Sequence, residues 1–175
     1  MSLASSSGSV PRFAPALLAV LAVAAVPGAA SASDRAWATV NICDTVGAPD
    51  GMGVRANMPG TGRPRRMYLR FRAQYLDTGG WRAVHGVGSS PWIFVGLVRR
   101  GSEQEGWTFR FDKPPPGASF RTRGIVDFQW RARRRRGGRK RWVVVKRRRA
   151  VTRAGVTDVD EGDPPGTSLA SCLIA

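Results

Sequence analysis

The largest group of side chains that could do chemistry lies between residues 131 and 149. The chain has 28 basic residues against 12 acidic ones and a formal net charge of +16. Basic residues at such density concentrate positive potential, which draws anionic polymers to a protein. Trp142 and Tyr68 would add stacking contacts if exposed, although aromatic residues in strands usually belong to the core. We predict a polyanion-binding site formed by Arg133, Arg134, Arg135, Arg136, Arg139, Lys140, Arg141, Lys146, Arg147, Arg148 and Arg149.

Two plainer explanations of this basic stretch stay open. All but three of the basic residues are arginine, and with abundant alanine, glycine and proline this bias resembles the usage of a GC-rich bacterial genome. Part of the charge would then reflect genome composition rather than binding. Like charges on a hairpin also discourage edge-to-edge pairing of sheets. A solvated hairpin that binds nothing is therefore the alternative to a polyanion site.

Residues for catalysis are few. The single histidine, His85, precedes Ser89 and Ser90, but no nucleophile-elbow motif surrounds either serine. A carboxylate pair of the glycosidase kind depends on the fold rather than on sequence spacing. Most acidic residues fall in predicted loops; Asp127 lies within a predicted strand, and we expect it to face solvent near arginines of the next strand. These observations argue against an enzyme.

Metal ligands and cofactor motifs are also scarce. One histidine and two cysteines supply too few nitrogen and sulfur ligands for a zinc site. The acidic segment 156–166 falls short of the common calcium loop, because Leu169 stands where that loop has its closing glutamate. No glycine-rich phosphate loop follows a strand and opens a helix. We therefore predict neither a metal nor a cofactor, and we expect the acidic segment to be a solvated loop.

Residues 1–32 have the order of a secretory signal peptide. Arg12 is followed by an apolar run at 13–26 and by small residues at 30–32, before the expected cleavage point. The apolar run is shorter than the roughly 20 residues of a membrane-spanning helix, so no transmembrane segment is predicted in the mature form. We expect residues 33–175 to be a single domain that is secreted into the periplasm, cell wall or medium. Nothing in the sequence indicates an oligomeric state.

Cys43 and Cys172 lie near the two ends of the predicted domain. In an exported chain, an even number of cysteines favours a disulfide over a metal site or a catalytic thiol. We therefore predict a Cys43–Cys172 bond that closes the domain and pins its ends together.

The elements that must position these groups are strands. Alternation of apolar and polar residues is clearest at 67–76, where Met67, Leu69, Phe71, Ala73 and Tyr75 share one face and Tyr68, Arg70, Arg72 and Gln74 share the other. Further strands are predicted at 36–43, 81–85, 92–98, 107–111, 124–133 and 141–149, separated by turns rich in glycine and proline. Seven short strands at this spacing predict an all-β sandwich or barrel.

Two glycines at 137–138 separate the last two strands and predict a tight hairpin. A two-residue turn would place Ala132 opposite Val143 and Trp130 opposite Val145. A three-residue loop with a bulge would place Trp130 opposite Val144 instead. The sequence does not decide between these registers.

The stretch SFRTRGIVDFQWR at 119–131, with the hairpin that follows it, resembles the penultimate strand of immunoglobulin-like or fibronectin-type domains. The resemblance covers most of residues 36–155 and implies an immunoglobulin-like antiparallel β-sandwich. Two features depart from antibody domains. Their disulfide joins two central strands, whereas Cys43 and Cys172 lie near the domain ends, and Phe120 cannot supply the hydroxyl of a tyrosine corner.

These features together predict an exported, non-enzymatic binding or structural module of the cell envelope. In that compartment the expected partners are anionic envelope polymers or other envelope proteins, whereas nucleic acid is not expected. A small secreted hydrolase using His85 or a carboxylate pair is the alternative function. A concave pocket that gathers His85 with aspartate or serine side chains would favour the hydrolase.

Overall fold

Residues 35–175 are described by a computed structural model, and they form nine strands and no α-helix. The predicted signal peptide at 1–32 lies outside the described residues. Within residues 35–175 there is no helix long and apolar enough to cross a membrane. In chain order the strands are β1 (Trp37–Thr45), β2 (Ala48–Pro59), β3 (Arg65–Asp77), β4 (Gly80–Ala83), β5 (Ile93–Val98), β6 (Ser102–Arg110), β7 (Phe120–Arg136), β8 (Arg139–Val151) and β9 (Cys172–Ile174).

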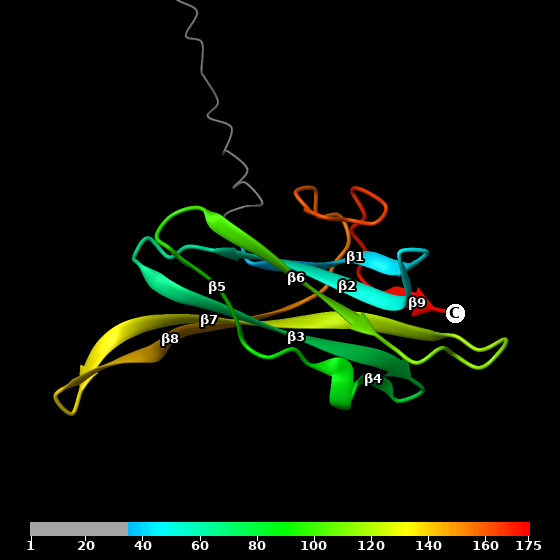
Figure 1. The fold of residues 1–175 in the computed structure, drawn as a ribbon, viewed down its shortest axis with the longest axis horizontal. Coiled ribbons are helices and arrows are strands. Elements are labelled where there is room, and N and C mark those ends of the chain that lie inside the picture. The colour runs from blue at the N-terminus through cyan, green and yellow to red at the C-terminus, as the bar shows by residue number, and fades with distance from the viewer. Residues whose placement is uncertain (1–34) are drawn as a thin grey trace, which may run out of the picture.

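The strands form two antiparallel sheets that pack face to face (Figure 1). One sheet has three strands in the order β1-β2-β6. The other has six strands: β4 and β5 pair with one edge of β3, β7 pairs with its other edge, and β8 and β9 pair with the far edge of β7. This arrangement confirms the predicted all-β antiparallel sandwich, with nine described strands rather than seven.

The core lies between the two sheets and follows the alternation expected for residues 67–76. The predicted inner face of β3 is buried except at its end, where Tyr75 is exposed. The indole Nε1 of Trp130 donates a hydrogen bond to the carbonyl oxygen of Pro59 at 2.9 Å, which links β7 to β2 across the core. The largest fully buried side chains include Met67, Leu69 and Phe71 of β3, Phe128 and Trp130 of β7, and Met52 and Met58 of β2.

β2 departs from the alternation pattern because both of its sides are covered. Its residues from Gly51 to Met58 are all buried, including Arg55. The segment that follows β8 covers its outer side, where Arg55 Nη1 donates to Glu161 at 2.7 Å. A strand covered on both faces shows no alternation of apolar and polar residues, and its glycines and prolines are typical of turns. The sequence pattern therefore does not reveal this strand.

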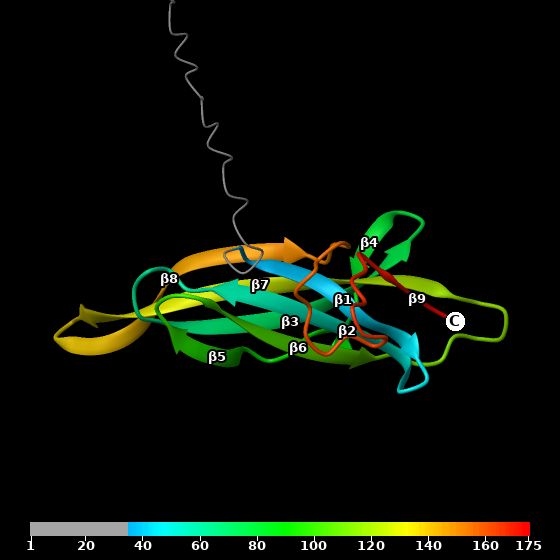
Figure 2. The ribbon, with the colours of Figure 1, turned by 90° about the horizontal axis from the view of Figure 1, so that it is seen from above.

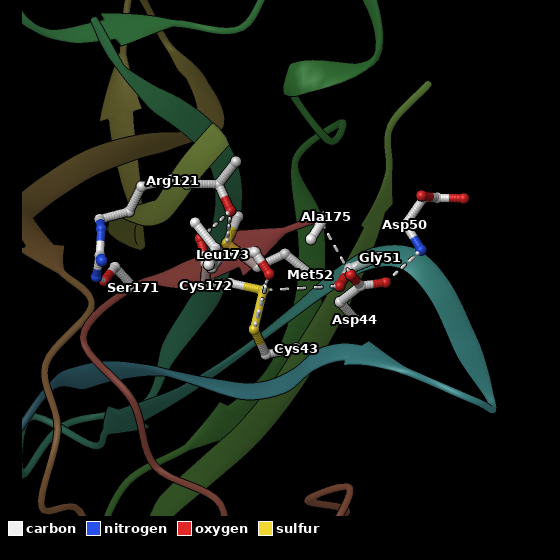
Figure 3. The surroundings of a disulfide bond; sticks show 11 residues. Cys43, Asp44, Asp50, Gly51, Met52, Arg121, Ser171, Cys172, Leu173 and Ala175 are labelled. Atoms are coloured by element: carbon white, nitrogen blue, oxygen red, sulfur yellow. Dashed lines mark hydrogen bonds between the residues drawn. A yellow bond between two sulfur atoms is a disulfide. The ribbon is translucent and has the colours of Figure 1, made fainter. Parts of the chain in front are cut away.

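The predicted Cys43–Cys172 disulfide is present, and it joins the two sheets (Figure 3). Cys43 lies in β1 and Cys172 in β9, and their Cα atoms are 5.3 Å apart. Beside the bond, the Asp44 carboxylate accepts hydrogen bonds from the backbone N–H groups of Asp50 at 2.8 Å and Ala175 at 3.1 Å. These contacts fix the C-terminus against the first hairpin.

The turn at 137–138 is the two-residue turn, one of the two alternatives considered, and the register changes within the hairpin. Both glycines have positive φ, of 56° and 76°, as a type I′ turn requires. Farther from the turn, Trp130 pairs with Lys146, and Val145 is the extra residue of a β-bulge. The register of a two-residue turn is correct near the turn, where Ala132 lies opposite Val143. Beyond the bulge it fails, because Trp130 lies opposite neither Val145 nor Val144.

Candidate anion-binding face

The β-bulge at Val145 decides which residues of β8 face the core. Beyond the bulge, Ala150 lies opposite Val126 on the core side, and Arg149 lies opposite Asp127 on the other side. Without the extra residue, strict alternation would place Arg149 opposite Val126. The bulge therefore lets a strand rich in arginine present a small apolar residue to the core.

We call the side of the six-stranded sheet that faces away from the core the outer face. Its arginines come from three neighbouring strands, because β7 pairs with both β3 and β8. Aromatic side chains lie among them. The outer-face residues considered below are Arg66, Tyr68, Arg70 and Arg72 of β3, Arg123, Asp127, Arg131, Arg133 and Arg135 of β7, Lys140, Trp142, Arg147 and Arg149 of β8, and Trp92 and Phe94 beside β3.

Several guanidinium groups of the outer face lie on aromatic rings. The guanidinium carbon of Arg131 is 4.0 Å from the ring centroid of Tyr68, and that of Arg66 is 4.4 Å from the ring centroid of Trp142. The same stacking joins Arg70 to Trp92 at 4.9 Å and Arg123 to Trp81 at 4.2 Å. Stacking restricts each guanidinium. Arg131 also donates to Gln129 through Nε and Nη2, and Arg123 donates to Gln74 through Nε. An anion would therefore meet the N–H groups that these contacts leave over.

The carboxylate of Asp127 contacts three arginines of the outer face. Arg149 Nε donates to it at 2.8 Å, Arg72 Nη2 lies 3.0 Å from it, and Arg70 Nη2 donates at 3.2 Å. Asp127 is only 9% exposed. Our expectation of arginine neighbours is confirmed, but the expectation that Asp127 faces solvent is wrong, because these side chains cover it.

The arginines around Asp127 also determine its protonation. Burial by itself would raise the pKa of Asp127. Hydrogen bonds from Arg149 and Arg70 and the positive charge of Arg72 outweigh burial, so the pKa lies below the ordinary value of an aspartate. The carboxylate is therefore charged wherever the protein works near neutral pH.

Beside Asp127 the outer face is hollowed by a cavity of about 390 Å³. Arg70, Trp92, Arg147 and Arg149 are among its lining residues. Arg147 forms no ion pair with any other residue in the described part of the chain. The cavity thus combines an uncompensated cation with an aromatic ring, which suits an anionic group attached to a larger body.

The residues of the predicted polyanion site lie in one hairpin but on two sides of it. Alternation along the two strands places Arg133, Arg135, Lys140, Arg147 and Arg149 on the outer face, and Arg134, Arg141, Lys146 and Arg148 on the opposite side. Arg136 and Arg139 flank the turn. The end of the hairpin projects beyond the three-stranded sheet, as Figure 1 shows. Only five of the predicted residues therefore share the outer face.

Analysis of the hairpin alone misses the arginines of β3. Arg70 lies opposite Asp127 because β3 pairs with β7. The polar face of the strand predicted at 67–76 already contained Tyr68, Arg70 and Arg72, but alternation does not reveal which strand lies beside it. The expectation that Trp142 belongs to the core is also wrong, because Trp142 is 38% exposed on the outer face.

The residues considered for catalysis lie between β4 and β5, where Ser89 forms a β-bridge with Arg72 of β3. His85 is exposed and precedes a short 3₁₀ turn, Gly86–Gly88. Ser90 is buried, and its hydroxyl accepts from the backbone N–H of Phe71 at 3.0 Å and donates to the carbonyl of Pro91 at 2.8 Å. Within residues 35–175, no group of three or more His, Cys, Asp or Glu side chains could hold a metal ion.

No protein-family model, curated protein or solved structure matches the chain. Its function is therefore inferred from the residues of the outer face and their geometry.

Proposed function

We propose that the chain is an exported, non-enzymatic binding module of the cell envelope, and that its outer face binds an anionic polymer. The observation that carries this proposal is the gathering of arginines from three strands on one face, with guanidinium groups stacked on aromatic rings. Phosphate, sulfate or carboxylate groups along a polymer would pair with these guanidinium groups. Nearby aromatic rings would contact the polymer between its charges.

Held guanidinium groups favour a binding face over a merely solvated one. A long basic side chain has about 2 kcal/mol of rotamer entropy to lose when a ligand fixes it. Stacking has already restricted Arg131 on Tyr68 and Arg66 on Trp142. Less entropy is therefore lost on binding, as in any preorganised site.

Export supports an envelope polymer, or another envelope protein, as the partner. Residues 1–32 have the order of a signal peptide, and a Cys43–Cys172 disulfide is typical of proteins in oxidising compartments. An exported protein would meet anionic polymers of the envelope rather than chromosomal nucleic acid. The immunoglobulin-like or fibronectin type of the sandwich, and an origin in a GC-rich bacterium, are part of the same proposal.

Retention on heparin, used as a general polyanion, tests the proposal across a salt series. We expect the protein to be retained at low salt and to elute as salt screens its charges. Serine at Arg133, Arg134, Arg135 and Arg136 should lower the eluting salt concentration. A control with serine at the exposed residues Arg82, Arg100, Arg110 and Lys113 removes the same charge elsewhere and should elute close to wild type.

Two results would contradict the proposal. One is failure of the wild-type protein to be retained at low salt. The other is an equal loss of retention in the hairpin variant and the control, because net charge alone would then explain binding. Isolated wall polymer, used in place of heparin, shows whether an envelope component binds in the same way.

A further inference from the structure

The end of β8 runs beside β1, as Figure 2 shows from above. A second basic cavity lies at this place. The two strands belong to different sheets. Just after β8, the backbone N–H of Arg153 donates to the carbonyl of Ala38 at 3.0 Å, and the Thr39 hydroxyl donates to the carbonyl of Arg153 at 2.7 Å. We call the cavity beside this junction the seam cavity, and it measures about 270 Å³.

Four arginines line the seam cavity: Arg35, Arg148, Arg149 and Arg153. Arg149 is paired with Asp127. The other three form no ion pair with any residue in the described range, and no acidic residue is among the described residues that line the cavity. Three uncompensated cations around one cavity repel each other, and an anion bound between them would offset this repulsion.

Trp37, which has an unsatisfied hydrogen-bond donor, also lines this cavity. Trp37 lines the cavity, is only 2% exposed, and its indole Nε1 has no hydrogen-bond acceptor among residues 35–175. Buried polar groups are nearly always hydrogen-bonded. An anion in the cavity would lie beside the residue that carries this unpaired donor, so the indole N–H of Trp37 is placed to report its binding.

The seam cavity and the cavity of the outer face share Arg148 and Arg149. In the β8 ladder these two residues point to opposite sides of the sheet. We propose that the seam cavity is a second anion site, and that it takes one phosphate, sulfate or carboxylate group of the polymer bound on the outer face. The polymer would then cross the edge of the sheet at the end of β8.

The identity of the ligand as a polymer rests on the proposed function, whereas the anion site can be tested by itself. Titration with inorganic sulfate, and separately with inorganic phosphate, uses the indole N–H resonance of Trp37 as the reporter. This resonance is identified by its loss in Trp37→Phe. We expect it to shift and to saturate in the wild-type protein.

Two variants with equal charge make this titration specific. Arg35→Ser with Arg153→Ser removes two exposed cations of the seam cavity, and Arg82→Ser with Arg110→Ser removes two exposed cations elsewhere. We expect saturation to disappear in the first variant and to persist in the second. A Trp37 resonance that does not move in the wild-type protein, or that responds equally in both variants, would overturn the inference.

Heparin binding separates this inference from the proposed function. We expect the Arg35→Ser and Arg153→Ser variant to bind heparin about tenfold more weakly than its charge-matched control, because two charge-assisted contacts are lost. If both bind equally while the Arg133–Arg136 variant binds weakly, the polymer does not reach the seam cavity, and the proposed function stands. If wild type is not retained on heparin but sulfate shifts Trp37, the polymer is refuted and the anion site stands.

Discussion

Both sheets have arginine–carboxylate clusters on their outer sides, but the ratio of arginines to carboxylates differs between the two clusters. On the three-stranded sheet one arginine, Arg55, is paired with two carboxylates, Glu161 at 2.7 Å and Asp160 at 3.7 Å. On the six-stranded sheet one carboxylate, Asp127, is paired with three arginines. The first group of side chains therefore has a negative net charge, and the second group has a positive net charge. The placing of the carboxylates therefore decides which side of the protein attracts anions.

Removing the bond between the two sheets should have the largest effect on stability. Serine at both Cys43 and Cys172, which are 129 positions apart, should lower the free energy of unfolding by about 5 kcal/mol through the chain entropy regained in the unfolded state. Urea unfolding measures this loss. Reductant should lower the stability of the wild-type protein but leave the double variant unchanged. A wild-type protein insensitive to reductant would contradict the prediction.

Removing the carboxylate at the centre of the outer face should have the next largest effect. Asp127→Asn keeps the shape of the side chain but removes the charge that three arginines share. We expect the free energy of unfolding at pH 7 to fall by about 2 kcal/mol, the usual contribution of hydrogen bonds to a charged group. Urea unfolding of both proteins measures the difference, and an unchanged midpoint would contradict it.

The lowered pKa of Asp127 gives this difference a pH dependence. A carboxylate whose pKa is lower in the folded protein stabilises it fully above the ordinary aspartate pKa, and this contribution disappears as the pH falls through the lowered value. The difference between wild type and Asp127→Asn should therefore be constant near neutral pH and shrink in strong acid. Unfolding series at several pH values measure it, and a difference that grows in acid would refute the assigned pairing.

Replacing Arg55 of the three-stranded sheet should have the smallest effect. The side chains of Glu161 and Asp160 are 78% and 62% exposed, so both stay hydrated in Arg55→Met. The buried methionine also avoids the desolvation of a guanidinium group. We expect the free energy of unfolding to change by less than about 1 kcal/mol. A loss as large as that of Asp127→Asn would show that the two arrangements are energetically alike.

The alternation in the sequence predicts much of what positions the outer face. It identifies the core residues of β3 and, with the two glycines at 137–138, the hairpin of β7 and β8. It does not reveal that Arg70 meets Asp127, because pairing between distant strands depends on how two complete faces fit. The bulge at Val145 is hidden for the same reason: it follows from the need to place a small residue opposite Val126.

The expected export of the chain and its even number of cysteines predicted the disulfide, whereas the sequence pattern did not predict β2. β2 is covered on its outer side by the segment after β8, so Arg55 is buried although its strand neighbours suggest a turn. Burial on both sides is a property of the assembled fold and leaves no periodic pattern in a short segment. The same holds for the seam cavity, where Arg35 and Arg153 meet from nearly opposite ends of the described chain.

The central claim, that polymer binds the outer face rather than the hairpin as a whole, is tested most directly by two variants of equal charge. Arg133→Ser with Arg135→Ser changes the outer face, and Arg134→Ser with Arg141→Ser changes the opposite side. Heparin affinity is measured for both across a salt series. We predict that the first variant lowers the slope of log affinity against log salt by about two, and the second by less than about half a unit. Equal slopes in the two variants would contradict the account.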